Sequence, residues 1–346
     1  MRGTRPASDT VEPVPAPTRQ NTAADAAASA APDTAAAHRA TAPTGSTARP
    51  PAHPPALPDD AVDAVIAWYA ENARDLPWRD PDRTAWGVLV SEVMLQQTPV
   101  ARVLPRWQEW MRRWPGPADL AEAPTAEVLR AWDRLGYPRR ALRLQECARV
   151  IRDRHAGTVP HGQDALLALP GIGAYTAAAV TAFAHGEHAV VVDTNIRRVL
   201  ARAVQGRALP APSLTAAEQR LAAATVPAEQ DHSVAWNQAV MELGALICTA
   251  RTAHCEQCPL SAGHCRWLAA GKPSAPAGAR RVQAFEGTDR QMRGQIMALL
   301  REHGQAGMEQ MLALDPQDPQ RVRRCAASLC ADSLAVQCAD GGLRLP

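Results

Sequence analysis

Four cysteines within a short stretch are the strongest constraint on how this chain can fold. Cys248, Cys255, Cys258 and Cys265 follow the spacing C-x6-C-x2-C-x6-C, directly after an apolar helical segment. Four thiolates this close in sequence can surround one metal centre, and both zinc and a [4Fe–4S] cluster accept four thiolate ligands. Zinc sites usually pair two C-x2-C units, and only one is present here. The spacing therefore favours a [4Fe–4S] cluster over zinc, and it disfavours disulfides in an intracellular chain.

The length and composition predict a folded, intracellular protein with a long N-terminal tail. The chain has 346 residues, of which 46% are hydrophobic, so it can build two or three domains with real cores. It has no apolar run long enough to span a bilayer and no signal peptide. We therefore expect a cytoplasmic, nucleoid-associated protein with no membrane partner. Residues 1–57 are rich in Ala, Pro and Thr without apolar periodicity, which predicts a disordered tail.

From residue 58 to about residue 267 the sequence repeats helical patterns separated by turns. Asp59 and Asp60 provide an N-cap and acidic charge at the start of the first helix. Apolar positions at helical spacing predict further helices at 87–97, 99–113, 126–135, 139–154, 174–185, 194–204, 215–224 and 234–247. No useful run of alternating polar and apolar residues interrupts them. The predicted class is all-α.

The C-terminal part of the chain indicates a separate small module. Residues 268–287 have the composition of a linker. Helices are expected at 289–302 and 318–331, followed by two short apolar runs around an Asp-Gly-Gly turn. We predict a winged-helix-like module at 288–346, with a small α+β extension of another type as the alternative.

A glycine-containing turn between two helices indicates a binding site for DNA phosphate. The sequence Leu169-Pro170-Gly171-Ile172-Gly173 lets the backbone turn tightly at the start of the next helix, where the helix dipole favours an anion. Such a turn can also link two helices without binding any ligand. Several arginines on nearby helices favour the DNA interpretation over a merely solvated helix face. They are Arg139, Arg140, Arg143, Arg149, Arg152 and Arg154.

Two carboxylates have the contrasting environments that glycosidic bond cleavage needs. Glu92 lies among Val, Met and Leu in the sequence SEVMLQQT, where desolvation raises the pKa of a carboxyl and suits it to donate a proton. Asp193 follows an apolar run where a helix begins, and the dipole and backbone N–H groups there favour its ionised form. Taken alone, Asp193 is explained as a plain N-cap and Glu92 as a surface acid. Together they can divide the work between protonating a leaving base and stabilising a cationic sugar.

These motifs together resemble the MutY family of adenine DNA glycosylases, in the helix-hairpin-helix glycosylase superfamily. The resemblance covers about 59–267 and rests on Arg74-Asp75-Leu76-Pro77-Trp78-Arg79, SEVMLQQT, Leu135-Gly136-Tyr137, LPGIG, Val192-Asp193-Thr194-Asn195 and the four cysteines. It implies a two-lobed catalytic domain at 58–267. One lobe would be a six-helix lobe with the hairpin at 81–190, and the other a cluster lobe from 58–80 and 191–267. Many members carry a C-terminal Nudix-like domain, and the short region after 287 does not look like it.

The resemblance also implies an activity. The chain would act as a monomer on double-stranded DNA that contains an adenine mispair. It would hydrolyse the N-glycosidic bond of adenine opposite 8-oxoguanine or guanine, without a lyase step.

The resemblance assigns a role to individual residues. Glu92 would protonate adenine, Asp193 would stabilise or trap the oxocarbenium ion, and Tyr175 and Asn195 would lie beside Asp193. Gln96, Gln97 and Tyr137 match family residues that enter the DNA helix. Arg79 and Gln238 match family residues that line the adenine pocket. Gly171 and Gly173 would contact DNA phosphate.

Three alternatives remain at this point. An endonuclease III-like glycosylase needs a lysine as Schiff-base nucleophile just after the LPG-x-G turn, but Tyr175 stands there and Lys272, in the linker, is the only lysine in the chain. A thymine-mismatch glycosylase would not need Glu92 in its SEVMLQQT context. A nonenzymatic iron–sulfur DNA-binding protein gives no reason for Glu92, Tyr175 and Asp193 to occur together.

Overall fold

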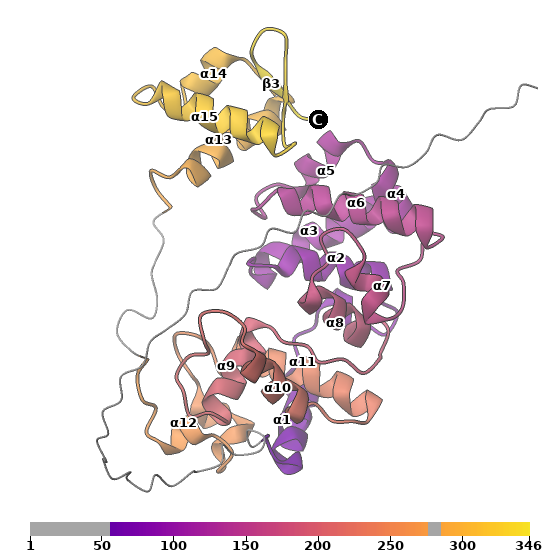
Figure 1. Ribbon diagram of the computed structural model, residues 1–346, viewed down its shortest axis with the longest axis vertical. Coiled ribbons are helices and arrows are strands. Elements are labelled where there is room, and N and C mark those ends of the chain that lie inside the picture. The colour runs from indigo at the N-terminus through magenta and orange to yellow at the C-terminus, as the bar shows by residue number, and fades with distance from the viewer. Residues whose placement is uncertain (1–55, 276–284) are drawn as a thin grey trace, which may run out of the picture. The chain divides into compact units, whose positions relative to one another are not determined.

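The computed structural model describes residues 56–275 and 285–346, most of which are helical (Figure 1). Most of the predicted tail at 1–57 and part of the predicted linker at 268–287 lie outside the described residues. Two boundaries shift where the chain is described. Leu57 is buried in a core instead of belonging to a tail, and the last cysteine is followed by a short helix that extends to Ala269.

The first group of helices comes from one continuous stretch of chain. It consists of α2 (Ala85–Leu95), α3 (Val100–Arg113), α4 (Pro117–Glu122), α5 (Thr125–Trp132), α6 (Arg139–Arg154), α7 (Gln163–Leu167) and α8 (Ala174–Phe183). The Thr84 side chain caps α2 by accepting a hydrogen bond from the Gly87 N–H at 3.0 Å. Trp110 and Trp132 are fully buried and pack edge to face at 5.5 Å. Residues 81–190, which were expected to hold six helices, therefore hold the seven helices α2 to α8.

The second group joins segments that are far apart in the sequence. It consists of α1 (Asp59–Asn72), α9 (Thr194–Ala203), α10 (Ala216–Thr225), α11 (Gln230–Leu246), α12 (Arg266–Ala269) and the 3-10 turns η2 (Cys255–Gln257) and η3 (Pro259–Ser261). A further 3-10 turn, η1 (Pro77–Arg79), packs against α2 and places Trp78 in the core of the first group. Helix α1 packs against α11 and the η3 turn, and α11 also packs against α9 (Figure 1). Apolar residues of α1, α9 and α11 such as Val65, Leu200 and Leu243 form one core.

Helices α2 and α8 pack against each other and contribute to both cores. Val88 of α2 belongs to the second core, whereas Leu89 and Val93, on other faces of the same helix, belong to the first. Helix α8 divides its side chains in the same way, with Val180 in the first core and Ala179 in the second. Polar groups on these two helices are therefore held where the two cores meet.

The C-terminal residues form the small module that the sequence predicted. It contains α13 (Asp289–His303), β1 (Gln305–Ala306), α14 (Met308–Leu312), α15 (Pro319–Ala331), β2 (Val336–Gln337) and β3 (Leu343–Arg344). The expected hairpin is β2–β3, and β1 adds a third antiparallel strand, giving the order β1-β3-β2. Helices with a terminal hairpin fit the winged-helix-like expectation, although the module's boundaries stay a prediction.

Most differences from the expected helices arise at their ends or in short elements. The helix expected at 126–135 ends at Trp132 because Asp133 has a left-handed backbone with φ of 45°. The helix expected at 234–247 begins four residues earlier, at Gln230, because the Glu229 side chain caps it. Helices α4, α7 and α14 were missed because five or six residues are too few to show an apolar period. No helix within the described ranges is long and apolar enough to cross a bilayer.

The tryptophan cluster makes a direct prediction about stability. Trp110 is 1% exposed and lies 4.9 Å from the Trp114 ring centroid. We expect Trp110→Ala to lower the free energy of unfolding by about 3–5 kcal/mol, since it leaves a cavity that the surrounding helices cannot fill. Denaturant unfolding of the full chain measures this. The control Leu214→Ala removes an exposed side chain and should change stability by no more than about 0.5 kcal/mol; equal losses in the two variants would contradict the prediction.

Candidate active site

Glu92 lies on the buried face of α2 and accepts a hydrogen bond from Tyr175 on α8. The Tyr175 Oη donates to the Glu92 Oε2 at 2.7 Å, and Glu92 is only 6% exposed. Burial raises the pKa of Glu92 to about 7, and the nearby Asp193 adds to the rise while the Tyr175 hydrogen bond and Arg79 oppose it. The pKa of Glu92 is raised, which is the direction that its apolar sequence neighbours indicated. A carboxyl with this pKa is partly protonated at neutral pH and can donate a proton.

Tyr175 stays protonated beside the two acids. Burial, followed by the charges of Glu92 and Asp193, raises its pKa well above 10. Its hydroxyl therefore serves as a hydrogen-bond donor to Glu92 across the physiological range. The sequence resemblance placed Tyr175 beside Asp193, and the hydroxyl of Tyr175 is hydrogen-bonded to Glu92.

Asp193 caps the N-terminus of α9 and is held there by two donors. Its Oδ1 accepts from the Ile196 N–H at 2.6 Å and its Oδ2 accepts from the Asn195 Nδ2 at 2.8 Å. The sequence argument expected these groups to favour the ionised form, and they do lower the pKa of Asp193. Burial outweighs them, however, and the net pKa of Asp193 is raised, an effect that the sequence argument did not include.

The two acids and the tyrosine come from three helices but form one electrostatically coupled group. Asp193 raises the pKa of Glu92, and both acids raise the pKa of Tyr175. Their side chains meet because α2 and α8 pack together and both contribute to the core that contains α9. The arrangement pairs a proton donor of near-neutral pKa with a carboxyl hydrogen-bonded at a helix N-terminus.

A buried ion-pair network holds Arg79 next to this group. Glu242 on α11 is 1% exposed and accepts from the Arg74 backbone N–H at 3.0 Å and from the Arg74 Nε and Nη2, both at 2.7 Å. The Arg79 Nη2 donates to the same carboxylate at 2.9 Å. Burial alone would raise the pKa of Glu242, but the two arginines outweigh it and lower that pKa to about 2. Arg79 also lies 5.6 Å from the ring centroid of Tyr69.

Sequence reasoning selected Arg79 but missed Glu242. The signal was present, because Glu242 stands between Met241 and Leu243 in an apolar helix, as Glu92 stands among apolar neighbours. Gln238 lies one turn before Glu242 on α11 and is partly buried. Residues four apart share a helix face. This placement agrees with a position near Arg79, while the contact of Gln238 with adenine stays a prediction.

The three residues expected to enter the DNA helix lie in two loops. The Gln96 Nε2 donates to the Thr176 Oγ1 at 3.4 Å, which ties the end of α2 to α8. Gln97 and Tyr137 are exposed and have left-handed backbones, with φ of 57° and 48°. A left-handed conformation costs an L-residue about 1–2 kcal/mol, so both side chains are held outward at an energetic cost.

The glycine turn at 169–173 joins α7 to α8, as the sequence predicted for a hairpin between helices. Gly171 has φ of +78°, and an added Cβ would lie 2.9 Å from the Cβ of Arg143, so both backbone and space require glycine. Gly173 is extended and forms the N-cap of α8, with open space around it. Ile172 is buried between them and fixes the turn to the core.

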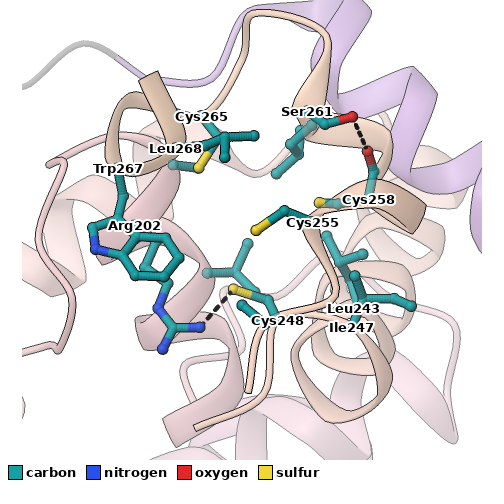
Figure 2. A pocket seen from close by; sticks show the side chains of 14 residues that line it. Arg202, Leu243, Ile247, Cys248, Cys255, Cys258, Ser261, Cys265, Trp267 and Leu268 are labelled. Atoms are coloured by element: carbon teal, nitrogen blue, oxygen red, sulfur yellow. Dashed lines mark hydrogen bonds between the residues drawn. The ribbon is translucent and has the colours of Figure 1, made fainter. Parts of the chain in front are cut away.

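The four cysteines line one small, partly open hollow beside α9 and α11. Figure 2 shows their sulfur atoms pointing toward the same space, which is otherwise lined mainly by apolar side chains, with Arg202 and Ser261 also at its edge. The Arg202 Nη1 lies 3.3 Å from the Cys248 Sγ. Burial, with the three neighbouring thiols, raises the pKa of Cys258 to about 12. The Cys258 thiol therefore ionises at neutral pH only with a cation beside it, as in a thiolate-bound metal centre.

Within 56–275 and 285–346, no three His, Cys, Asp or Glu side chains are grouped tightly enough to hold one metal ion. The four cysteines nevertheless border the same hollow, so they are the side chains here that could hold a thiolate-bound group.

Comparisons with known proteins agree with this geometry. Residues 90–223 match the HhH-GPD superfamily of base excision DNA repair proteins. The adenine DNA glycosylase of Mycolicibacterium smegmatis is 49% identical over 282 residues, covering 81% of this chain and 94% of that protein. The adenine DNA glycosylase of Mycobacterium tuberculosis H37Rv is 48% identical over 284 residues, covering 82% and 92%.

Solved structures support the fold. A thermostable thymine-DNA glycosylase has a TM-score of 0.55 and 29% identity, covering 61% of this chain and 98% of its own. Endonuclease III in a trapped covalent intermediate with DNA has a TM-score of 0.53 and 21% identity, covering 62% of this chain and 96% of its own. At that identity, the similarity shows the fold alone. The identity and coverage of the mycobacterial relatives identify the family. The chain is a DNA N-glycosylase of base excision repair and belongs to the adenine DNA glycosylase family.

Proposed function

We propose that this chain is a monofunctional glycosylase that acts as a monomer on adenine paired with 8-oxoguanine or guanine in duplex DNA. The observation that carries the proposal is the buried Glu92 carboxyl, whose pKa of about 7 is set beside Asp193 and Tyr175. A purine is a poor leaving group unless it is protonated, and a glycosidic bond breaks through an oxocarbenium-like state that a carboxylate stabilises. The site supplies both groups.

The chemistry follows from these side chains. The target nucleotide must leave the duplex before its bond is accessible. Glu92 then donates its proton to the adenine ring while the C–N bond breaks, and the bonding electron pair leaves with the base. The ionised Asp193 stabilises the positive charge on the sugar. Water adds to the sugar carbon, and its proton returns to the Glu92 carboxylate, which restores the starting state.

Two further groups would recognise the extruded base. The Arg79 guanidinium is fixed by Glu242 and lies within electrostatic reach of Glu92. Gln238 carries both donors and acceptors on a neighbouring turn of α11. We propose that Arg79 and Gln238 contact adenine, and that Gly171, Gly173 and the start of α8 contact a DNA phosphate.

The residue inventory supports the absence of a lysine-based lyase step. A Schiff base needs a lysine amine at the reacting sugar. Lys272 is the only lysine in the chain, and it follows α12, beyond the last of the four cysteines. Tyr175, in the first turn of α8, is hydrogen-bonded to Glu92.

A glycosylase assay tests the activity and the lyase step together. We expect purified protein to convert duplexes with adenine opposite 8-oxoguanine or guanine into abasic-site products, with strand cleavage appearing only after alkali because no lysine can attack the sugar. Duplexes with adenine opposite thymine serve as the control and should stay intact. Cleavage without alkali would revive the lyase alternative, and release of thymine from a T·G duplex in place of adenine would overturn the substrate.

The pKa of Glu92 predicts how the reaction depends on pH. Only the neutral carboxyl can protonate adenine, so the single-turnover rate should fall as pH rises through about 7. Glu92→Gln should release no measurable adenine at any pH while still binding the duplex. Glu146→Gln, at an exposed site on α6, is the matched control and should keep the wild-type profile. A wild-type rate that stays level across neutral pH would contradict the assignment.

The Glu92→Gln variant should be more stable than the wild type at alkaline pH. Folding raises the pKa of Glu92 from 4.5 to about 7, so the folded chain retains a proton in this window that the unfolded chain has lost. Stability is therefore lost as pH rises through the window, by an amount on the order of 3 kcal/mol once both states are ionised. Glu92→Gln has no ionisable group at this position, so it should not lose this stability as pH rises. Thermal unfolding of the wild type and of the variant at acidic and alkaline pH measures the difference.

We propose that Cys248, Cys255, Cys258 and Cys265 hold a [4Fe–4S] cluster. When bound, the group would supply four metal–thiolate bonds, and the four cysteines would thereby join the end of α11 to α12 across an otherwise irregular loop. The nearby Arg202, which also stacks on Trp267 with its guanidinium carbon 4.6 Å from the ring centroid, provides positive charge next to the thiolates. The cysteines fit the group because they face one hollow and have no disulfide.

Metal analysis tests the cluster without relying on activity. We expect about four iron and four sulfide per chain, and we expect Cys258→Ser to lose most of the iron and to unfold at a lower temperature. Cys338→Ser, in the C-terminal module, is the control and should keep the wild-type iron content. One zinc per chain with no iron would overturn the cluster in favour of a single-ion site.

A further inference from the structure

We propose that Arg140 is a positioning residue that fastens together the two loops carrying Gln97 and Tyr137, so that both side chains face the DNA at one place. The inference rests on the proposed function, because it assumes that these two exposed side chains act on duplex DNA. The sequence analysis counted Arg140 among the arginines of 139–154 that favour DNA binding over a merely solvated helix face. Its guanidinium instead turns inward and contacts protein.

One end of the guanidinium binds the chain that follows Glu92. The Arg140 Nη1 donates to the carbonyl oxygens of Val93 at 2.9 Å and Met94 at 3.1 Å. It also donates to the Gln96 carbonyl at 2.6 Å. These carbonyls belong to the last turn of α2 and its C-cap, where intrahelical partners are missing. Arg140 therefore ends α2 and directs the backbone into the left-handed residue Gln97.

The other end binds the turn that precedes Tyr137. The Arg140 Nη2 donates to the Leu135 carbonyl at 3.2 Å and the Gly136 carbonyl at 3.0 Å. It also donates to the Thr98 Oγ1 at 3.0 Å, and that hydroxyl in turn donates to the Leu135 carbonyl at 3.1 Å. One side chain thus joins both loops, and Thr98 completes the link between them.

The surroundings of Arg140 suit a guanidinium and no other side chain. None of the described carboxylates forms an ion pair with Arg140, and its charge is balanced by carbonyl oxygens and by the rings of Trp132 and Tyr137, at 5.1 Å and 5.6 Å. Burial lowers the pKa of Arg140 to about 10, which still leaves it charged at neutral pH. A lysine ammonium has only three donors at one point and cannot reach both loops at once.

The two loops hold strained, exposed side chains beside the catalytic group. Gln97 and Tyr137 are exposed although both backbones are left-handed. Gln97 is five residues after Glu92, at the end of the same helix. Proteins keep such strain where the surrounding contacts impose it and where function uses the conformation. Here the occupant that fits is a base pair of duplex DNA, because Tyr137 offers a ring for stacking and Gln97 an amide for hydrogen bonding.

The experiment compares two substrates that differ in the work needed to extrude adenine. Arg140→Lys and the control Arg113→Lys, which affects only an exposed pair with Glu109, are measured in single turnover on duplexes with adenine opposite guanine or opposite a tetrahydrofuran abasic analogue. We expect Arg140→Lys to slow release opposite guanine by about 10- to 100-fold. Release opposite the analogue, where no opposite base must be parted from adenine, should slow much less. Arg113→Lys should match the wild type on both.

The outcomes separate this inference from the proposed function. Wild-type protein that releases no adenine from either duplex would refute the proposed function. An active wild type combined with equal slowing of Arg140→Lys on both duplexes would overturn the positioning role and leave the function intact.

A second variant tests whether Arg140 acts through Tyr137. Tyr137→Gly removes the ring while allowing the left-handed backbone. If Arg140 acts through Tyr137, the effects of Arg140→Lys and Tyr137→Gly on the rate opposite guanine should be less than additive in a double-mutant cycle. Additive effects would contradict the inference.

Discussion

The desolvation of one carboxyl, Glu92, is the constraint on which the site depends. A carboxylic acid in water is ionised at neutral pH and cannot protonate a base, so the fold has to supply an apolar environment around it. Helices α2 and α8 do this by contributing to both cores, which leaves Glu92 6% exposed with a single tyrosine hydroxyl as its partner. The free energy that burial costs the ionised Glu92 is therefore what keeps a proton on this carboxyl for the reaction.

The protein handles its other buried acid in the opposite way. Glu242 is as deeply buried as Glu92, yet two arginines surround it and keep its pKa near 2. The difference lies in the number of charged donors, since Glu92 has one neutral donor and Glu242 has two guanidinium groups and a backbone N–H. Arg79 is thereby neutralised by Glu242, and Glu92 remains the group that exchanges its proton.

Local sequence patterns predicted the helices and the grouping of the four cysteines better than they predicted contacts between distant segments. The long helices followed from apolar periodicity, and the four cysteines from their spacing alone. The direction of the Asp193 shift could not be predicted, because N-capping is visible in the sequence whereas the depth of burial depends on packing from α2, α8 and α11. Arg140 was misjudged for the same reason, since its position on an arginine-rich helix gives no sign that two loops fold over it.

The packing of α1 against α11 has a consequence for how the chain acquires its structure during synthesis. Of the described helices, α1 is synthesised before the others, but its partner α11 is made only after α2 to α10 have been completed. At usual translation speeds this delay is on the order of ten seconds. The lobe containing α2 to α8 is continuous and can form during that time. The apolar face of α1, which includes Val62 and Val65, therefore stays without its α11 partner until that helix has been made.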